Sequence, residues 1–292
     1  MKCPYHFLKK IYLCEKIVCM LNYIVWNFEP RIFPNSNLYI AWYGVCFALG
    51  VYLCYLIVSY AWKKEGRAED VLNKVVIWLL VALIVGARLG HCLFYEPDYY
   101  LSNPLEILKT WKGGLASHGA AVALPITVYI LSRKYDFNWV WFLDRLAIGV
   151  ALAGSFIRLG NFFNSEIYGI ETTLPWGVIF VMNGETVPKH PTQLYESLAY
   201  LLIFVLLFCL YQKKGTKLRT GFLSGLFLVL VFVFRFFIEF IKNPQVDFET
   251  NMVLNMGQLL SIPFILLGVY LLFFYKPKPA KEQIKKEEGG LK

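Results

Sequence analysis

Seven long apolar runs dominate the sequence. A bilayer core about 30 Å thick needs roughly 20 apolar residues per crossing helix. With 58% hydrophobic and 17% charged residues, the 292-residue chain is too apolar for soluble domains. A transmembrane β-barrel is excluded because its strands would be short, alternating segments. We therefore expect an all-α polytopic membrane protein with seven transmembrane helices, the third and fifth of them short, at about residues 38–60, 75–95, 118–132, 139–160, 195–211, 222–241 and 252–275.

Basic residues follow every second run, whereas the loops between them are neutral or acidic. This alternation is the positive-inside pattern, which predicts a cytoplasmic C-terminus and, with seven spans, an N-terminus outside. It also accounts for the net charge of +9 without a nucleic-acid partner. The residues that set this topology are Lys63, Lys64, Arg67, Arg133, Lys134, Lys213, Lys214, Lys217, Arg219 and the lysines of the tail.

The two ends of the chain stand apart from the apolar runs. Residues 1–37 carry five basic residues, which would favour the inside and so oppose the predicted topology. Their mixed stretch at about 11–28 fits an interfacial helix, a weak signal segment or a misplaced start codon equally well. The tail at 276–292 is rich in Lys, Glu and Gly, and we expect it to be cytoplasmic and disordered. The membrane domain is therefore expected to occupy residues 38–275.

No motif in the sequence signals a metal or an organic cofactor. The seven cysteines include no CxxC pair and no metal-ligand spacing, and they are best explained as packing residues. Dinucleotide, P-loop, GxSxG and HExxH motifs are also missing from the sequence. We therefore expect that no cofactor is needed.

Polar residues within the apolar runs are the best candidates for a functional site, because ionisable groups in a membrane are expensive. The predicted topology places several of them near the outer ends of their spans, at the depth of the outer lipid headgroups. Arg158 is followed three residues later by Asn161, a pair that is hard to explain by packing alone. The residues expected at this depth are Tyr43, Arg88, His91, His118, Arg158, Arg235 and Glu239.

Simpler explanations exist for some of these residues. Arg235 and Glu239 are four residues apart, so they share a helix face and can neutralise each other. Arg88, near the end of a span, can extend its side chain to the interface. His118 follows a double glycine and can merely cap a helix. The signal therefore comes from the set rather than from any single residue.

The segment Arg158-Leu-Gly-Asn-Phe-Phe-Asn-Ser-Glu-Ile-Tyr-Gly169 closely resembles the signature of the prolipoprotein diacylglyceryl transferase family. Further segments agree with that family in order, and the resemblance covers about residues 38–275. They are Trp42-Tyr43-Gly44, Gly86-Ala-Arg88-Leu-Gly90, Gly113-Gly114-Leu-Ala-Ser-His118-Gly119, His190-Pro-Thr-Gln-Leu-Tyr-Glu196 and Arg235-Phe-Phe-Ile-Glu239-Phe. Three positions depart from the family pattern, namely Ala41, Ala120 and Val231, and these put accessory hydrogen bonds in doubt.

The resemblance implies a bacterial inner-membrane enzyme that performs the first step of lipoprotein maturation. Its substrates would be phosphatidylglycerol and the lipobox cysteine thiol of a prolipoprotein signal peptide, and the diacylglyceryl group would form a thioether as glycerol phosphate leaves. A small periplasmic cap is expected within about 161–194. The implied catalytic residues are His118, Arg158 and Arg235, and the implied substrate-binding residues are Tyr43, Arg88, Asn161, Glu166, Gly169, His190 and Glu239.

The chemistry assigns hypothetical roles to these residues. Arg158 and Arg235 would clamp the phosphate, because a guanidinium binds phosphate through paired hydrogen bonds. His118 would take the thiol proton, since an imidazole titrates near neutral pH. Glu239 would orient Arg235, Glu166 would order the signature loop or bind the glycerol hydroxyls, and Tyr43 would bind a lipid oxygen.

Three other classes of protein compete with this interpretation. An anion transporter or channel would use the intramembrane arginines, but transporters usually place their sites near the midplane and often contain inverted repeats. A headgroup phosphotransferase would generally need acidic metal-binding clusters, which the predicted spans lack. A structural scaffold would not need Arg158, Arg235 and His118 at one depth.

Overall fold

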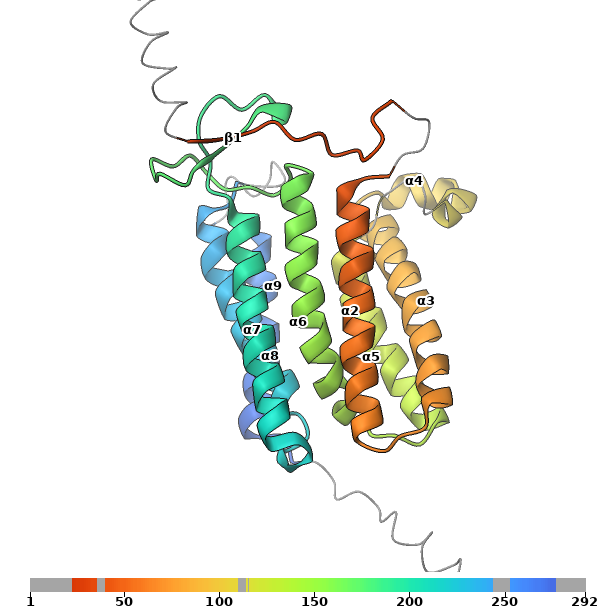
Figure 1. Cartoon of the computed structure of the whole chain (residues 1–292). Coiled ribbons are helices and arrows are strands. Elements are labelled where there is room, and N and C mark those ends of the chain that lie inside the picture. Colours follow the sequence, from red (N-terminus) through yellow and green to blue (C-terminus); the bar gives the residue numbers. More distant parts are fainter. Residues whose placement is uncertain (1–22, 36–39, 110–113, 115, 244–252, 277–292) are drawn as a thin grey trace, which may run out of the picture. The chain divides into compact units, whose positions relative to one another are not determined.

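The computed structural model describes residues 23–35, 40–109, 114, 116–243 and 253–276 (Figure 1). The side chains of Ser117 and His118 are outside this description. Residues 1–22 and 277–292 are also outside it. They include most of the predicted N-terminal extension and nearly all of the predicted disordered tail, so these two predictions are not tested. The predicted boundaries of the membrane domain therefore stay a prediction.

A long helix lies over each of the seven apolar runs. Shorter helices cap or follow them: α4 (Pro97–Ser102), η1 (Pro104–Leu108), η3 (Val181–Asn183), η4 (Gly215–Lys217) and η5 (Glu239–Ile241). The long helices are α2 (Trp42–Lys64), α3 (Glu69–Phe94), α5 (Ser117–Lys134), α6 (Trp139–Phe163), α7 (Thr192–Lys214), α8 (Phe222–Ile238) and α9 (Met256–Phe273).

Six helices in the described part of the chain are long and apolar enough to cross a membrane. They are α2, α3, α6, α7, α8 and α9, of which the spans of α7 and α8 extend into η4 and η5. The remaining long helix, α5, has 18 residues and contains Pro125. The expected polytopic helical membrane protein is thus confirmed, with six helices suited to span the bilayer. Helix α6 is the most enclosed, with 61% of its apolar window buried against 17–39% in the others.

Contacts divide the chain into two compact units. Unit 1 comprises residues 1–54, 150–209 and 226–269, and unit 2 comprises residues 55–149, 210–225 and 270–292. Eight of the ten predicted site residues belong to unit 1, whereas Arg88 and His118 belong to unit 2.

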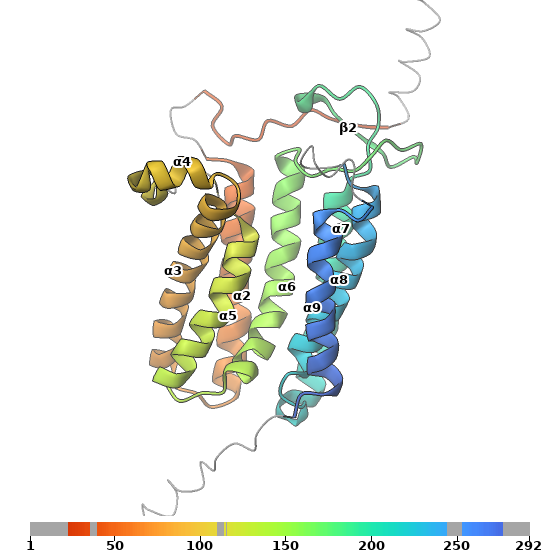
Figure 2. The same ribbon diagram turned by 180° about the vertical axis from the view of Figure 1, so that it is seen from behind.

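In unit 2, α3 and α5 pack side by side along a seam of glycines (Figure 2). A Cβ atom added at Gly119 would lie 2.0 Å from the carbonyl oxygen of Gly86, and one at Gly90 would lie 2.7 Å from the Cα of Gly119. Small residues let helix backbones approach this closely, which is how helices often associate where no water drives them together. The seam therefore requires glycine on both helices.

Unit 2 also contains a buried ion pair. Glu65 accepts hydrogen bonds from Arg145 Nε at 2.9 Å, from Trp141 Nε1 at 2.7 Å and from the Tyr211 hydroxyl at 2.9 Å. The side chains of Arg145 and Glu65 are only 6% and 8% exposed. With both oxygens of the carboxylate satisfied, the pair can tolerate its loss of water, and it ties the residue after α2 to α6 and α7.

Unit 1 contains a two-stranded parallel sheet. Strand β1 (Ile24–Trp26) pairs with β2 (Val178–Phe180), which lies between α6 and α7 in the sequence (Figures 1 and 2). Trp26 packs against Phe162 with ring centroids 4.4 Å apart, which adds an aromatic contact to the strand pairing. The alternatives considered for residues 11–28 did not include this strand. It anchors the described part of the N-terminal extension to the segment predicted to form the periplasmic cap.

Candidate active site

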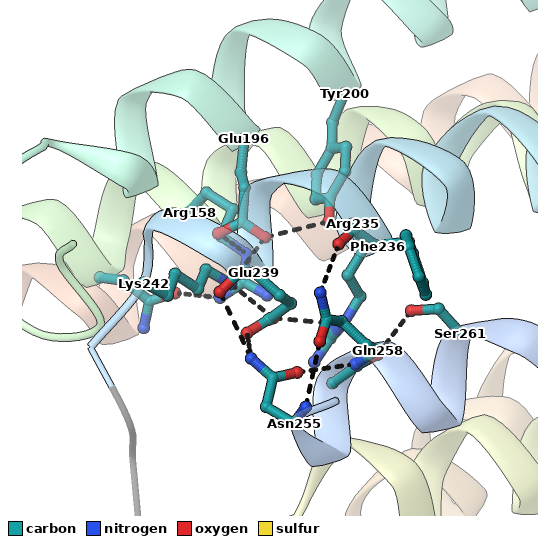
Figure 3. Close-up of polar contacts among 12 residues, drawn as sticks. Arg158, Glu196, Tyr200, Arg235, Phe236, Glu239, Lys242, Asn255, Gln258 and Ser261 are labelled. Atoms are coloured by element: carbon teal, nitrogen blue, oxygen red, sulfur yellow. Dashed lines mark hydrogen bonds and ion pairs between the residues drawn. The ribbon is translucent and has the colours of Figure 1, made fainter. Parts of the chain in front are cut away.

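Five charged side chains form an alternating chain in unit 1 (Figure 3). Arg158 Nε lies 3.2 Å from Glu196 Oε2, and Lys242 Nζ lies 3.1 Å from Glu196 Oε1. The same ammonium lies 3.0 Å from Glu239 Oε1, which in turn lies 3.8 Å from Arg235 Nε. The three cations and two carboxylates carry a net charge of +1. We call these five side chains the charge chain. Arg235 and Glu239 thus lie close enough to pair, as their spacing on one helix face allowed.

The charge chain is largely removed from solvent. The side chains of Glu196 and Lys242 are 0% and 2% exposed, and that of Arg158 is 14% exposed. Arg235 is the most accessible member, at 31%. Charges act on each other more strongly where water is scarce, so this arrangement attracts an anion that approaches from the side of Arg235.

Asn255, the residue before α9, holds Glu239 of the charge chain. Asn255 Nδ2 donates to Glu239 Oε2 at 3.2 Å (Figure 3). Asn255 also caps α9, because its Oδ1 accepts from the Gln258 backbone N–H at 2.9 Å while Gln258 Oε1 accepts from the Asn255 N–H at 3.0 Å. This reciprocal cap fixes Asn255 and thereby fixes one oxygen of Glu239.

The signature segment forms the end of α6 and the loop that follows it. Arg158 Nη1 donates to Asn161 Oδ1 at 3.1 Å, one helical turn later. Asn161 Nδ2 lies 3.4 Å from Glu166 Oε2, and Asn164 Nδ2 donates to the other oxygen of Glu166 at 3.1 Å. The spacing of Arg158, Asn161 and Glu166 therefore reflects a relay of hydrogen bonds from the arginine to an exposed carboxylate.

Two residues of this loop adopt left-handed backbone angles. Ser165 has φ 56° and Ile167 has φ 59°. A β-branched residue in this region is strained, and such strain persists only where the surroundings enforce it. The loop is therefore held in shape by its neighbours rather than by its own preference.

Side chains clamp three consecutive carbonyl groups of the strained loop. Asn183 Nδ2 donates to the Ser165 carbonyl at 2.6 Å, and Gln193 Nε2 donates to the Glu166 carbonyl at 2.6 Å. The Thr192 hydroxyl donates to the Ile167 carbonyl at 2.8 Å. Thr192 and Gln193 are fully buried at the start of α7. The two sequence motifs therefore meet here, because residues of one hold the backbone of the other.

Gly169 is required by a close backbone approach. A Cβ atom there would lie 2.3 Å from the carbonyl oxygen of Ile241 and 2.8 Å from the Cβ of His190. The backbone N–H of Gly169 donates to the His190 carbonyl at 2.8 Å, and that of Ile170 donates to the Ile241 carbonyl at 2.9 Å. Gly169 thus lets the signature loop contact the residues that follow α8 and those that precede α7.

Tyr43 and His190 lie at the margins of this region. Tyr43, in the first turn of α2, packs on Gly160. A Cβ atom added at Gly160 would lie 3.1 Å from Cδ2 of Tyr43. The Tyr195 hydroxyl lies 3.4 Å from His190 Nδ1 and accepts from Trp176 Nε1 at 2.7 Å. Burial lowers the pKa of His190, so its ring is held toward the neutral form. The substrate contacts predicted for both residues stay predictions.

Arg88, in unit 2, is engaged by backbone carbonyl groups. Its guanidinium donates to the carbonyls of Glu106 at 2.7 Å, Ile107 at 2.9 Å and Gly114 at 3.2 Å. The residue is 3% exposed, so it does not extend to water as the simpler explanation supposed. These contacts connect α3 to η1 and to Gly114. His118 lies in the first turn of α5, and its side chain is outside the described part.

Sequence reasoning missed several members of the site. Lys242 continues the helical spacing of Arg235 and Glu239 by three more residues, which is a usable signal for a shared face. Glu196 is the last residue of the motif that begins at His190. Its partner Arg158 is on another helix, so no local sequence pattern pairs the two residues. Thr192 and Gln193 carry no charge and resemble ordinary helix-capping residues. Within the described residues, no three His, Cys, Asp or Glu side chains converge to hold a metal ion.

The apolar helices and the buried charge chain together define a polytopic membrane protein with a polar site among its helices. Residues 30–274 match the family model described as prolipoprotein diacylglyceryl transferase. The chain belongs to this family, as the sequence resemblance predicted, and it is a transferase.

Individual relatives agree with the family match over most of their length. A phosphatidylglycerol--prolipoprotein diacylglyceryl transferase of Tolumonas auensis is 44% identical over 259 residues, which is 88% of this chain and 100% of the relative. Proteins with the same name are 40% identical in Bacteroides fragilis, over 89% of this chain and 98% of the relative, and 42% identical in Porphyromonas gingivalis, over 90% and 98%.

Proposed function

We propose that this chain transfers the diacylglyceryl group of phosphatidylglycerol to the lipobox cysteine of prolipoproteins. The observation that carries the proposal is the net positive, buried charge chain that includes Arg158 and Arg235. The names of its relatives specify the lipid and the protein substrate for those proteins. An anionic phosphodiester is the group that such a site would attract.

The reaction displaces a phosphate ester from carbon. The thiolate sulfur forms a bond to the glycerol carbon of the diacylglyceryl group, and the bond from that carbon to the phosphate oxygen breaks. The electron pair leaves with that oxygen, so glycerol phosphate departs with one more negative charge than the diester carried. Arg158 and Arg235 would stabilise this growing charge, which is the kind of electrostatic term that usually contributes most to catalysis.

The thiol proton needs an acceptor, because the thiolate is the nucleophile. His118 is the proposed base, and the proton would pass from it to the departing phosphate or to water. Glu166 is exposed at the end of the relay from Arg158, a position suited to binding glycerol hydroxyls. Glu239 would orient Arg235, in accord with their contact at 3.8 Å.

The proposal includes a seven-span topology in the bacterial inner membrane. Helix α5 would supply the seventh crossing, since 18 helical residues extend over about 27 Å. The pairing of β1 with β2 supports placing residues 24–26 on the same side as the proposed periplasmic cap, within 161–194. The alternation of basic loops supports an outer N-terminus and a cytoplasmic C-terminus.

The test is a reaction with defined components. Purified protein is incubated with phosphatidylglycerol and a lipobox peptide, and the mass of the peptide is measured by mass spectrometry. We expect a diacylglyceryl increment on cysteine, loss of that increment in Arg158→Ala, and retention in Arg133→Ala, which removes an exposed arginine in the last turn of α5. No increment under conditions in which a relative is active would overturn the proposal and favour the anion transporter.

The role of His118 requires a separate substitution. His118→Gln keeps a polar side chain but cannot accept and release a proton at neutral pH. We expect it to abolish transfer while leaving lipid binding in place. Nearly intact transfer in this variant would show that His118 positions the substrate and that another group takes the proton.

A further inference from the structure

Lys242 occupies the centre of the charge chain, between the two carboxylates (Figure 3). We propose that Lys242 is a positioning residue for the transfer reaction: it neutralises Glu196 and Glu239, so that Arg158 and Arg235 can act on the phosphate of the lipid. This inference rests on the proposed function, and it concerns a residue that would act through the two arginines rather than on the substrate.

Both the side chain and the backbone of Lys242 are held by neighbouring residues. Its ammonium donates to Glu196 Oε1 at 3.1 Å and to Glu239 Oε1 at 3.0 Å, and its side chain is 2% exposed. Its backbone pairs with Gly169 of the signature loop, and the backbone N–H of the next residue, Asn243, donates to the Tyr168 carbonyl at 3.4 Å. A long lysine side chain is normally mobile, whereas this one is held in a single place.

The charges explain why a third cation is needed. With Lys242, three cations face two carboxylates, and the surplus of one positive charge matches one phosphodiester anion. Without it, two arginines would face two carboxylates, and the site would have no surplus charge. Each guanidinium would then be held by its own carboxylate, and the phosphate would have to compete for it.

Glu196 shows most clearly what Lys242 does. This carboxylate is fully buried and contacts Arg158 through one oxygen and Lys242 through the other. The Tyr200 hydroxyl adds a longer contact to that second oxygen, at 3.4 Å. If Lys242 were lost, the second oxygen would keep only the Tyr200 contact, and the carboxylate would draw Arg158 closer to itself.

The test uses variants that differ in charge but little in size. Lys242→Met keeps the aliphatic stem, Lys242→Arg keeps the charge, and Lys242→Met with Glu239→Gln restores the surplus of one positive charge. Lys189→Met is the matched control, because Lys189 also contacts two carboxylates, Glu171 and Glu185 at 3.4 Å each, outside the charge chain. Initial rates of transfer are measured at several concentrations of phosphatidylglycerol, and folding is followed by thermal unfolding.

We expect Lys242→Met to raise KM for phosphatidylglycerol and to lower kcat/KM by about 100-fold, as losses of buried charge partners commonly do. Lys242→Arg should recover most of that loss, the double variant should exceed Lys242→Met, and Lys189→Met should stay within about threefold of wild type. Full activity in Lys242→Met would overturn the proposal. So would a double variant that folds but is no more active than Lys242→Met.

A binding measurement separates this inference from the proposed function. Dioctanoyl phosphatidylglycerol and uncharged dioctanoylglycerol are titrated into the purified protein. The wild type should prefer the anionic lipid, and Lys242→Met should lose that preference even if no transfer is detected. An unchanged preference in Lys242→Met would overturn the inference, whereas a wild type that binds but does not transfer would overturn only the proposed function.

Discussion

Arg158 is held by Glu196, whose Oε2 lies 3.2 Å from the arginine Nε and whose side chain has no exposed surface. The two residues come from different helices, α6 and α7, and their contact joins the signature segment to the motif that begins at His190. Arg158 Nη1 also donates to Asn161 Oδ1 at 3.1 Å, so two contacts from different residues fix the orientation of the guanidinium. The phosphate-binding role proposed for Arg158 therefore depends on Glu196, which would orient the arginine without touching the substrate.

Glu196→Gln is expected to impair both folding and transfer. The substitution removes the negative charge that compensates Arg158 and Lys242, and breaking a buried pair in this way costs about 3–5 kcal/mol. Thermal unfolding temperature and transfer rate should both fall. Glu171→Gln is the control, because the Glu171 carboxylate is 71% exposed and its pairing with Lys189 contributes at most about 1 kcal/mol. Equal unfolding temperatures for the two variants would contradict this account.

Gly169→Ala is expected to abolish transfer. The new methyl group would lie 2.3 Å from the Ile241 carbonyl oxygen, so the signature loop would have to move away from the residues that follow α8. Gly44→Ala provides the comparison, since an added Cβ there meets nothing within 4 Å and alanine favours a helix by about 1 kcal/mol. Unfolding temperature should decrease in the first variant and not in the second. A fully active Gly169→Ala would show that the loop tolerates the displacement.

Thr192→Val is expected to loosen the strained loop. Valine has a similar shape but leaves the Ile167 carbonyl without the buried hydroxyl that binds it at 2.8 Å, a loss of about 1–3 kcal/mol. Limited proteolysis between α6 and α7 should become faster, and transfer should decrease. Thr173→Val, at an exposed position of the same segment, should change neither quantity. If both variants are cleaved at the wild-type rate, the clamp does not maintain the loop.

The lowered pKa of His190 predicts a pH-dependent stability. Burial disfavours the charged imidazole in the folded protein, whereas in the unfolded chain it takes up a proton near pH 6.5. The unfolded state therefore binds more protons below about pH 6.5, and stability falls as the pH decreases through this range toward the folded pKa. His190→Gln should lose less stability than the wild type when the pH is lowered from above to below this range, as measured by thermal unfolding. The same loss in both proteins would assign the effect to other groups.

The sequence predicted the helices well because each one is a local pattern. Apolar runs mark the long helices, and the pairing of Arg235 with Glu239 follows from their spacing on one helix. The contact of Lys242 with Glu196 joins the end of η5 to α7, and it depends on packing that no spacing encodes. The strained backbone at Ile167 was equally unpredictable, since isoleucine normally avoids that conformation.

The sheet was missed for a related reason. Strands β1 and β2 have three residues each, too few for an alternating pattern to stand out. Their pairing also joins distant parts of the sequence, as does the contact of the Tyr23 hydroxyl with the Thr173 carbonyl, 150 residues away. Such a pairing can be predicted only when the positions of the intervening helices are known.

This separation has a consequence for biosynthesis. Strand β1 is synthesised before its partner, which emerges only after α2, α3, α5 and α6 have been made. Contacts between distant residues form late, because the chain between them must first be ordered. Strand β1 therefore stays unpaired until these helices have been made, and Trp26 can complete the apolar cluster of Phe162, Val178 and Phe180 only once β2 has been synthesised.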